Sequence, residues 1–218
     1  AASTALHTLS DAFVYLSQYP YGCAEQIASR VLAATGLGEA LRAFAREVRP
    51  AEVQAEGKDD LEHLASFQNK DGGFGFWPEK RSNPYVSVHA AHAIAVAKAA
   101  GFGIPEKMGE GALKYLREIR EHIPKEYAGP VRKGLEAYAL HVMRKLDPEA
   151  GPASAEVLPR ARELARGRLE DLSPEAAHAV CGAAGLDPRV RPEDVPPELL
   201  PGLCRLVAAA VPRGGRFG

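Results

Sequence analysis

Two side chains near the start of the chain have the types and the spacing for covalent chemistry with each other. Cys23 and Gln26 are three residues apart in the run Y-P-Y-G-C-A-E-Q, which covers residues 19–26. If this run opens a helix, residues three apart share a face, so the thiol and the carboxamide can meet. The positive end of the helix dipole favours a thiolate at that point. We therefore predict that the sulfur displaces ammonia from Gln26 and leaves an internal thioester, an acyl group that a nucleophile can capture.

The flanking residues strengthen this prediction. A bare C-x-x-Q also occurs where a cysteine is only a small buried apolar residue. Here Tyr19 and Tyr21 stand on either side of a proline and are expected to form a hydrophobic lip that keeps water off the labile bond. Gly22 is expected to let the backbone turn sharply into the helix. Glu25 suits the helix start, where the dipole favours negative charge.

The whole run resembles the thioester motif of the alpha-2-macroglobulin and complement superfamily, especially that of the bacterial alpha-2-macroglobulins. Animal members typically read G-C-G-E-Q, and Ala24 stands here in the place of the second glycine. A second run, Q-N-K-D-G-G-F-G-F-W at residues 68–77, resembles the Q-x-x-D-G-x-x-G-x-W turns of α/α-toroid proteins. These proteins include thioester domains, terpene cyclases and protein prenyltransferases. We expect this loop to be structural, with Gln68 bonded to backbone and the aromatic side chains packed.

Composition limits the classes of partner. The 218 residues are 46% hydrophobic, enough for one substantial core, and the net charge of −1 argues against a nucleic-acid partner. No basic start leads into an apolar stretch, and no apolar run is as long as a membrane helix. Since full-length members of the suspected family are far longer, residues 1–218 are expected to be a single thioester-containing helical domain excised from a larger multidomain protein.

Apolar residues recur with a helical period along the chain, and no alternating stretch of strand length occurs. The predicted class is therefore all-α. By resemblance the architecture is an α/α toroid of helical hairpins, and the closing run R-G-G-R-F-G suggests that it is truncated at the C-terminus. The expected helices cover residues 4–18, the thioester segment to Gly36, 37–48, 51–68, 84–100, 105–122, 131–146, 153–170, 174–184 and 196–211.

Other candidate residues carry weaker signals. His89 and His92 are three apart, but no third ligand stands at a recognisable spacing, so no metal site is predicted. In some complement members a histidine from a later hairpin attacks the thioester. His122 lies in roughly that hairpin, but the residues around it do not match, so the role is not assigned to it. Cys181 and Cys204 could pair in a disulfide, although two buried thiols are the preferred interpretation.

The resemblance implies a covalent trap that acts once, and so an inhibitor rather than an enzyme. Protease cleavage of a bait region elsewhere in the full-length protein unshields the thioester. A lysine of the protease then attacks Gln26 and releases Cys23. The implied partners are target proteases and other domains of the same chain, with membrane contact only through an anchor outside this segment. The implied location is extracytoplasmic, periplasmic or secreted, in bacterial defence. No cofactor is implied.

An isoprenoid cyclase or prenyltransferase on the same toroid is the alternative function. Such enzymes need an acidic cluster or zinc ligands. Asp59 and Asp60 are the only adjacent pair of aspartates, and no further acidic cluster follows them. Aromatic residues, at 7%, are few for lining a carbocation cavity. A denatured mass distinguishes the two functions, because only thioester formation removes one ammonia.

Overall fold

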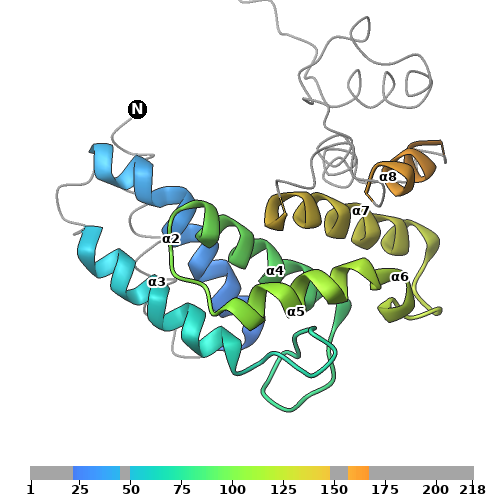
Figure 1. Ribbon diagram of the computed structural model, residues 1–218, viewed down its shortest axis with the longest axis horizontal. Coiled ribbons are helices and arrows are strands. Elements are labelled where there is room, and N and C mark those ends of the chain that lie inside the picture. The colour runs from blue at the N-terminus through green and yellow to red at the C-terminus, as the bar shows by residue number, and fades with distance from the viewer. Residues whose placement is uncertain (1–21, 45–49, 148–156, 167–218) are drawn as a thin grey trace, which may run out of the picture. The chain divides into compact units, whose positions relative to one another are not determined.

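The computed structural model describes residues 22–44, 50–147 and 157–166. The chain divides into two compact units, residues 1–117 and 118–218. The first unit contains α2 (Ala24–Phe44), α3 (Pro50–Ala65), α4 (Pro84–Ala99) and α5 (Glu106–Arg117), and the second contains α6 (Ile119–His122), α7 (Gly129–Leu146) and α8 (Val157–Arg166) (Figure 1).

The predicted all-α class is confirmed. Among the described residues the β-pairing is limited to one isolated bridge between Gln68 and Phe74. The helices expected at residues 4–18, 174–184 and 196–211 lie outside the described residues. The toroidal arrangement and the single-domain boundary stay predictions.

The helix that carries the Cys–Gln pair is longer than the sequence indicated. A stop at Gly36 and a separate helix over residues 37–48 were expected, and this was wrong, because α2 runs without a break to Phe44. A glycine inside a helix costs about 1 kcal/mol relative to alanine, which weakens a helix without ending it. The expected helix over residues 105–122 is instead divided at Glu118 into α5 and α6.

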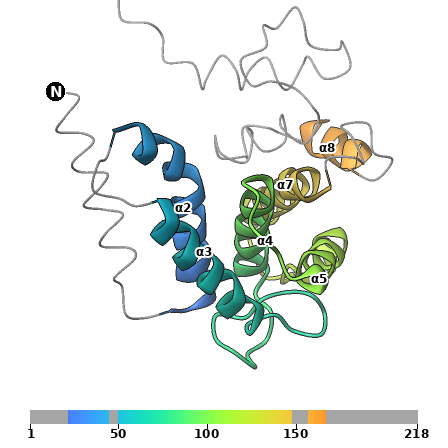
Figure 2. The same ribbon diagram turned by 60° about the vertical axis from the view of Figure 1, so that its left-hand side comes forward.

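In the first unit α2 packs against both α3 and α4, and α4 packs against α5 (Figures 1 and 2). Small side chains are common in the buried part of α4, where Ala90, Ala91 and Ala93 are fully buried. Asn83 caps α4 by accepting a hydrogen bond from the Val86 N–H at 3.2 Å, ahead of a proline in the first turn. The largest fully buried side chains of this unit are Ile27, Val31, Leu61, Leu64, Phe74, Val86, Ile94, Tyr115 and Leu116.

The loop between α3 and α4 is held by side chains that bond to backbone. Gln68 Nε2 donates to the carbonyls of Gly72 and Met108, each at 3.0 Å, which confirms the expected structural role of this glutamine. Asn69 Nδ2 donates to the Lys80 carbonyl at 2.8 Å, across the width of the loop. These bonds satisfy carbonyls that the irregular backbone cannot pair with itself, so the loop has one fixed shape.

Two glycines let this loop lie directly on α5. Gly72 has a positive φ of 88°, and a Cβ there would overlap the carbonyl of Gly111. A Cβ on Gly73 would overlap the ring of Tyr115. Glycine is therefore required at both positions of the D-G-G turn. Gly72 needs it for its positive φ and for the nearby Gly111 carbonyl, and Gly73 needs it because the Tyr115 ring lies too close for a side chain.

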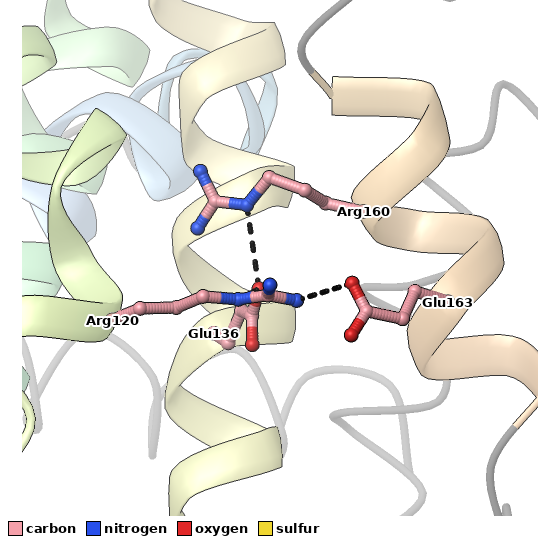
Figure 3. Close-up of polar contacts among 4 residues, drawn as sticks. All are labelled: Arg120, Glu136, Arg160 and Glu163. Atoms are coloured by element: carbon pink, nitrogen blue, oxygen red, sulfur yellow. Dashed lines mark hydrogen bonds and ion pairs between the residues drawn. The ribbon is translucent and has the colours of Figure 1, made fainter.

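In the second unit a buried carboxylate joins three helices. Glu136 of α7 accepts from Arg120 of α6 and from Arg160 of α8, the latter at 3.3 Å, and Arg120 also donates to Glu163 of α8 at 2.7 Å (Figure 3). Only 10% of the Glu136 side chain is exposed, against 65% for Glu163. Apolar residues fill the rest of this unit's core, namely Ile119, Ile123, Leu135, Leu140, Val142, Met143, Leu146, Val157, Ala161 and Leu164.

We expect Gly72→Ala to destabilise the chain by more than Gly101→Ala. Both glycines have positive φ, but nothing lies within 4 Å of a Cβ on Gly101. Gly101→Ala should therefore cost only the backbone strain, about 1–3 kcal/mol. Gly72→Ala adds the overlap with Gly111. Denaturant unfolding followed by the emission of Trp77, the sole tryptophan, measures both. Equal losses would show that the loop does not lie on α5.

Glu136→Gln should lower the free energy of unfolding by about 2 kcal/mol. Removing one partner of a buried pair costs about 3–5 kcal/mol, and the 45% exposure of Arg120 reduces that figure. The exposed Glu163→Gln is the matched control and should change stability by less than about 1 kcal/mol. Circular dichroism during chemical denaturation compares the two variants. A larger loss for Glu163→Gln would contradict the role assigned to Glu136.

Candidate functional site

The Cys23–Gln26 pair forms the N-terminal cap of α2. Because α2 begins at Ala24, Cys23 is the N-cap residue, and its carbonyl accepts the first helical bond from the Ile27 N–H at 3.0 Å. Gln26, at the third helical position, folds back so that its Oε1 accepts from the Cys23 N–H at 3.1 Å. This is the reciprocal half of a capping box, in which the side chain at that position bonds the N-cap amide.

This geometry brings the two predicted reactive residues together. The hydrogen bond fixes the Gln26 carbonyl beside the backbone of Cys23, so the carboxamide lies over the first turn and not out in solvent. Cys23 is buried, with 9% of its surface exposed, and forms no disulfide. Gln26 is half-buried. A thiol and a carboxamide are therefore held on one helical turn, with an N–H aimed at the carbonyl oxygen.

The loop between α3 and α4 supports this turn directly. The Ala24 N–H, another donor without a helical partner, donates to the Phe76 carbonyl at 3.0 Å. The aromatic side chains of this loop were expected to pack, and only some of them do. Phe74 is fully buried, but Phe76 is 43% and Trp77 is 50% exposed. The backbone of this segment, rather than its aromatic rings, anchors the start of α2.

A polar cluster lies on the side of α2 that faces α4. Ser29 Oγ donates to Glu25 Oε1 at 3.2 Å and lies 2.9 Å from His89 Nε2. The same ring nitrogen is 3.9 Å from Glu25 Oε1. The ring of Tyr85 stacks on His89, with centroids 5.8 Å apart and planes at 8°. Burial lowers the pKa of His89 and outweighs the opposing charge of Glu25.

Sequence reasoning missed Ser29 and left His89 without a role. The spacing of Glu25 and Ser29, four apart on a helix, is the signal that could have paired them. His89 comes from another helix, and nothing in the spacing of residues predicts that it reaches α2. No group of three or more His, Cys, Asp or Glu side chains placed to hold a metal ion occurs in the described part of the chain.

Gly22 does not have the role that the sequence suggested. It has no positive φ, and a Cβ at this position would meet only ordinary contacts at 3.6 Å, with His63 and Ile27. A sharp turn that only glycine permits is therefore not what this residue provides. The contact places the ring of His63, from the last turn of α3, beside the residue that precedes Cys23.

Several residues with a predicted or considered role lie outside the Cys23–Gln26 turn or outside the described residues. Tyr19, Tyr21, Cys181 and Cys204 lie outside the described residues, so the predicted lip and the cysteine pairing stay untested. His122, in the second unit, has its Nε2 3.9 Å from Glu118 Oε2 of the same chain segment. None of the helices that the structure describes is both long enough and apolar enough to cross a membrane.

Comparison with known proteins gives relatives of one kind, although no family model matches the chain. It is 36% identical over 104 residues to an alpha-2-macroglobulin of Xylella fastidiosa, covering 46% of this chain and 6% of that protein. An alpha-2-macroglobulin homolog of Yersinia pestis is 32% identical over 108 residues, covering 47% and 5%. An alpha-2-macroglobulin of Ralstonia nicotianae is 28% identical over 180 residues, covering 69% and 11%. The chain thus spans only a small part of these relatives.

Solved structures share the fold. Native Escherichia coli alpha-2-macroglobulin, from domain MG7 to the C-terminus, aligns with a TM-score of 0.68 at 17% identity, over 92% of this chain and 30% of that one. A Salmonella alpha-2-macroglobulin aligns with a TM-score of 0.70 at 18% identity, over 96% and 13%. The fold is therefore that of an all-helical part of the C-terminal region of bacterial alpha-2-macroglobulins. Together with the sequence matches, it makes the chain similar to a part of the bacterial alpha-2-macroglobulins.

We expect His89 to make the chain less stable as the pH falls. Its pKa in the folded chain is below its ordinary value of 6.5, so just below 6.5 the unfolded chain binds more protons. The free energy of unfolding should therefore fall from about pH 7 to about pH 5. His89→Gln removes the titrating ring and should make the free energy of unfolding depend less on pH. Glu25 and Tyr85, which face the ring, are still present in this variant. Unfolding curves at several pH values measure both slopes, and equal slopes would contradict the burial of His89.

Proposed function

We propose that Cys23 and Gln26 form an internal thioester and that the chain is the acylating domain of a covalent protease inhibitor. The hydrogen bond from the Cys23 N–H to Gln26 Oε1 carries this proposal. The Cys23 sulfur attacks the Gln26 side-chain carbonyl carbon, a C–S bond forms, and the C–N bond breaks. The thiol proton leaves with the nitrogen as ammonia.

The same hydrogen bond supports the capture step. When an amine attacks the thioester carbon, the carbonyl oxygen gains negative charge in the tetrahedral intermediate. A backbone N–H already aimed at that oxygen stabilises the charge without reorganisation. The C–S bond then breaks, the electron pair leaves on the Cys23 sulfur, and Gln26 stays attached to the amine. A Salmonella alpha-2-macroglobulin of this fold has been solved after reaction with methylamine, which supports amines as the nucleophiles.

The setting of this chemistry is proposed from the similarity to bacterial alpha-2-macroglobulins. The chain would be one domain of a longer protein whose other domains, with Tyr19 and Tyr21, exclude water until a protease cleaves a bait region. The attacking amine would then be a lysine of that protease. Each molecule would act once, as an inhibitor and not as an enzyme, outside the cytoplasm in the periplasm or after secretion.

In the full-length protein that carries this chain, we expect a denatured mass that is lower by one ammonia. Methylamine should release one thiol, at Cys23, and appear as an amide on Gln26. The sulfur is acylated at rest, so thiol reagents should not modify it before the amine is added. Intact-mass spectrometry and thiol titration measure these outcomes, with the modified residue located by peptide mapping.

Two variants remove the chemistry but keep the cap. Cys23→Ser places a favoured N-cap residue at the helix start, and Gln26→Glu keeps an acceptor for the Cys23 N–H. Neither variant should lose ammonia or capture a protease covalently, although both should fold. Covalent capture by Cys23→Ser would overturn the proposal.

A further inference from the structure

The peptide units on both sides of the Cys23 Cα are held by hydrogen bonds. The Cys23 N–H donates to Gln26 Oε1 at 3.1 Å. In the peptide unit that follows, the Cys23 carbonyl accepts from the Ile27 N–H at 3.0 Å. The N–H of that same unit, which belongs to Ala24, donates to the Phe76 carbonyl at 3.0 Å. Two fixed peptide planes fix φ and ψ of the residue between them, and so they fix the direction in which its side chain leaves the backbone.

Of these three bonds, the one to Phe76 comes from outside α2. The other two join residues of one helical turn and therefore move with that turn. Phe76 belongs to the loop between α3 and α4, which meets the start of α2 (Figure 2). The Phe76 ring is 43% exposed, so burial of its own side chain does not hold this residue. The place of its carbonyl depends on how the neighbouring backbone of the loop is anchored.

That anchor is Ser87, a buried serine of α4 that is 1% exposed. The Phe74 N–H donates to Ser87 Oγ at 2.8 Å. Ser87 donates its own proton to the Asn83 carbonyl at 2.7 Å, the shorter of its two contacts with carbonyls. A hydroxyl has one proton and two lone pairs, so the second lone pair is left for the phenol O–H of Tyr115. Every hydrogen-bonding site of Ser87 is thus used, and the hydroxyl has one orientation.

The short segment from Phe74 to Phe76 carries this anchoring to the carbonyl. Phe74 is fully buried. A Cβ on Gly75 would lie 2.5 Å from the Lys80 carbonyl oxygen and 2.9 Å from that of Trp77, so other backbone packs directly against the segment. A shift of Phe74 is therefore passed on to Phe76 and not absorbed between them.

We propose that Ser87 is a positioning residue for thioester formation. With Tyr115 behind it, Ser87 holds the Phe76 carbonyl in place. That carbonyl in turn directs the Cys23 sulfur towards the Gln26 carboxamide. This inference rests on the proposed thioester, in which the C–S bond forms, the C–N bond breaks, and the thiol proton leaves with the nitrogen as ammonia. Ser87 acts through the backbone and not on these atoms.

The test measures how fast newly made full-length protein loses ammonia. The protein is made by cell-free translation, free thiols are blocked at timed intervals, and the denatured mass is recorded. Ser87→Ala leaves the Phe74 N–H without its acceptor and should slow the loss about tenfold, since a misplacement of about 1 Å can cost about 10²-fold. Tyr115→Phe keeps the ring and removes one bond to Ser87, so it should slow the loss less, by about threefold.

The chemical state of Gln26 separates positioning from a general loosening of the site. A bond that has not formed leaves Gln26 with its amide and Cys23 with a free thiol. A bond that formed and was then lost to water leaves a carboxylate at position 26. Peptide mapping of the unacylated chains distinguishes the two, and in Ser87→Ala we expect the intact amide.

Two variants serve as controls. Ser66→Ala is the same substitution at an exposed serine whose Oγ bonds the His63 carbonyl. Gly101→Ala strains the backbone of the same unit at a position where nothing lies within 4 Å of the new Cβ. Both should lose ammonia at the wild-type rate. A Ser87→Ala variant with the wild-type rate, or with a carboxylate at position 26, would overturn the inference. So would an equal slowing by Gly101→Ala.

Failure of the proposed function is distinguishable from failure of this inference. If the wild-type protein loses no ammonia, the thioester is absent and both fall. If the wild type loses ammonia and both Ser87→Ala and Tyr115→Phe match its rate, the thioester stands and the role of Ser87 falls. Should Ser87→Ala fail to fold, Tyr115→Phe decides the question alone, because it removes one oxygen and leaves the ring beside Gly73.

Discussion

The site depends on how the first turn of α2 satisfies its backbone N–H groups. A helix start has donors with no helical partner, and here two of them are bonded in different ways. The Cys23 N–H donates to Gln26 Oε1, and the Ala24 N–H donates to the Phe76 carbonyl. The first bond places the proposed electrophile, and the second ties the turn to a loop more than fifty residues later in the chain. The geometry of the Cys–Gln pair is thus a consequence of ordinary capping.

That loop can anchor the turn only because it is itself fixed to the helices behind it. Ser87 of α4 accepts from the Phe74 N–H at 2.8 Å and also bonds the side chain of Tyr115 from α5. Burial raises the pKa of Tyr115 to about 12, and the Ser87 hydrogen bond only partly offsets this, so the phenol stays neutral in the core. The ring of Tyr115 in turn leaves room only for glycine at position 73. A buried contact between α4 and α5 thereby sets the position of Phe76, whose carbonyl meets α2.

The sequence predicted those parts of the site that follow from short spacing along the chain. Cys23 and Gln26 are three apart, and Gln68 stands at a fixed offset from the Asp-Gly-Gly turn, so local geometry alone relates them. The contact between Ala24 and Phe76 was not predictable in this way, because its acceptor is a carbonyl that every residue has. His89 was missed because α4 reaches Glu25 and Ser29 only through tertiary packing. Gly36 misled because a glycine weakens a helix without ending it, and α2 continues past both Gly36 and Gly38.

One residue type at position 26 meets two separate demands. A capping box accepts glutamine or glutamate at the third helical position, so the helix alone does not require the amide. Thioester formation does require it, because a carboxylate has no ammonia to release. The cap likewise accepts serine at position 23, where the chemistry needs sulfur. The fold and the proposed reaction therefore select overlapping but different sets of residues at the same two positions. The proposed chemistry of this helix start can be removed while its structure is kept, which is why Cys23→Ser and Gln26→Glu test the reaction and not the fold.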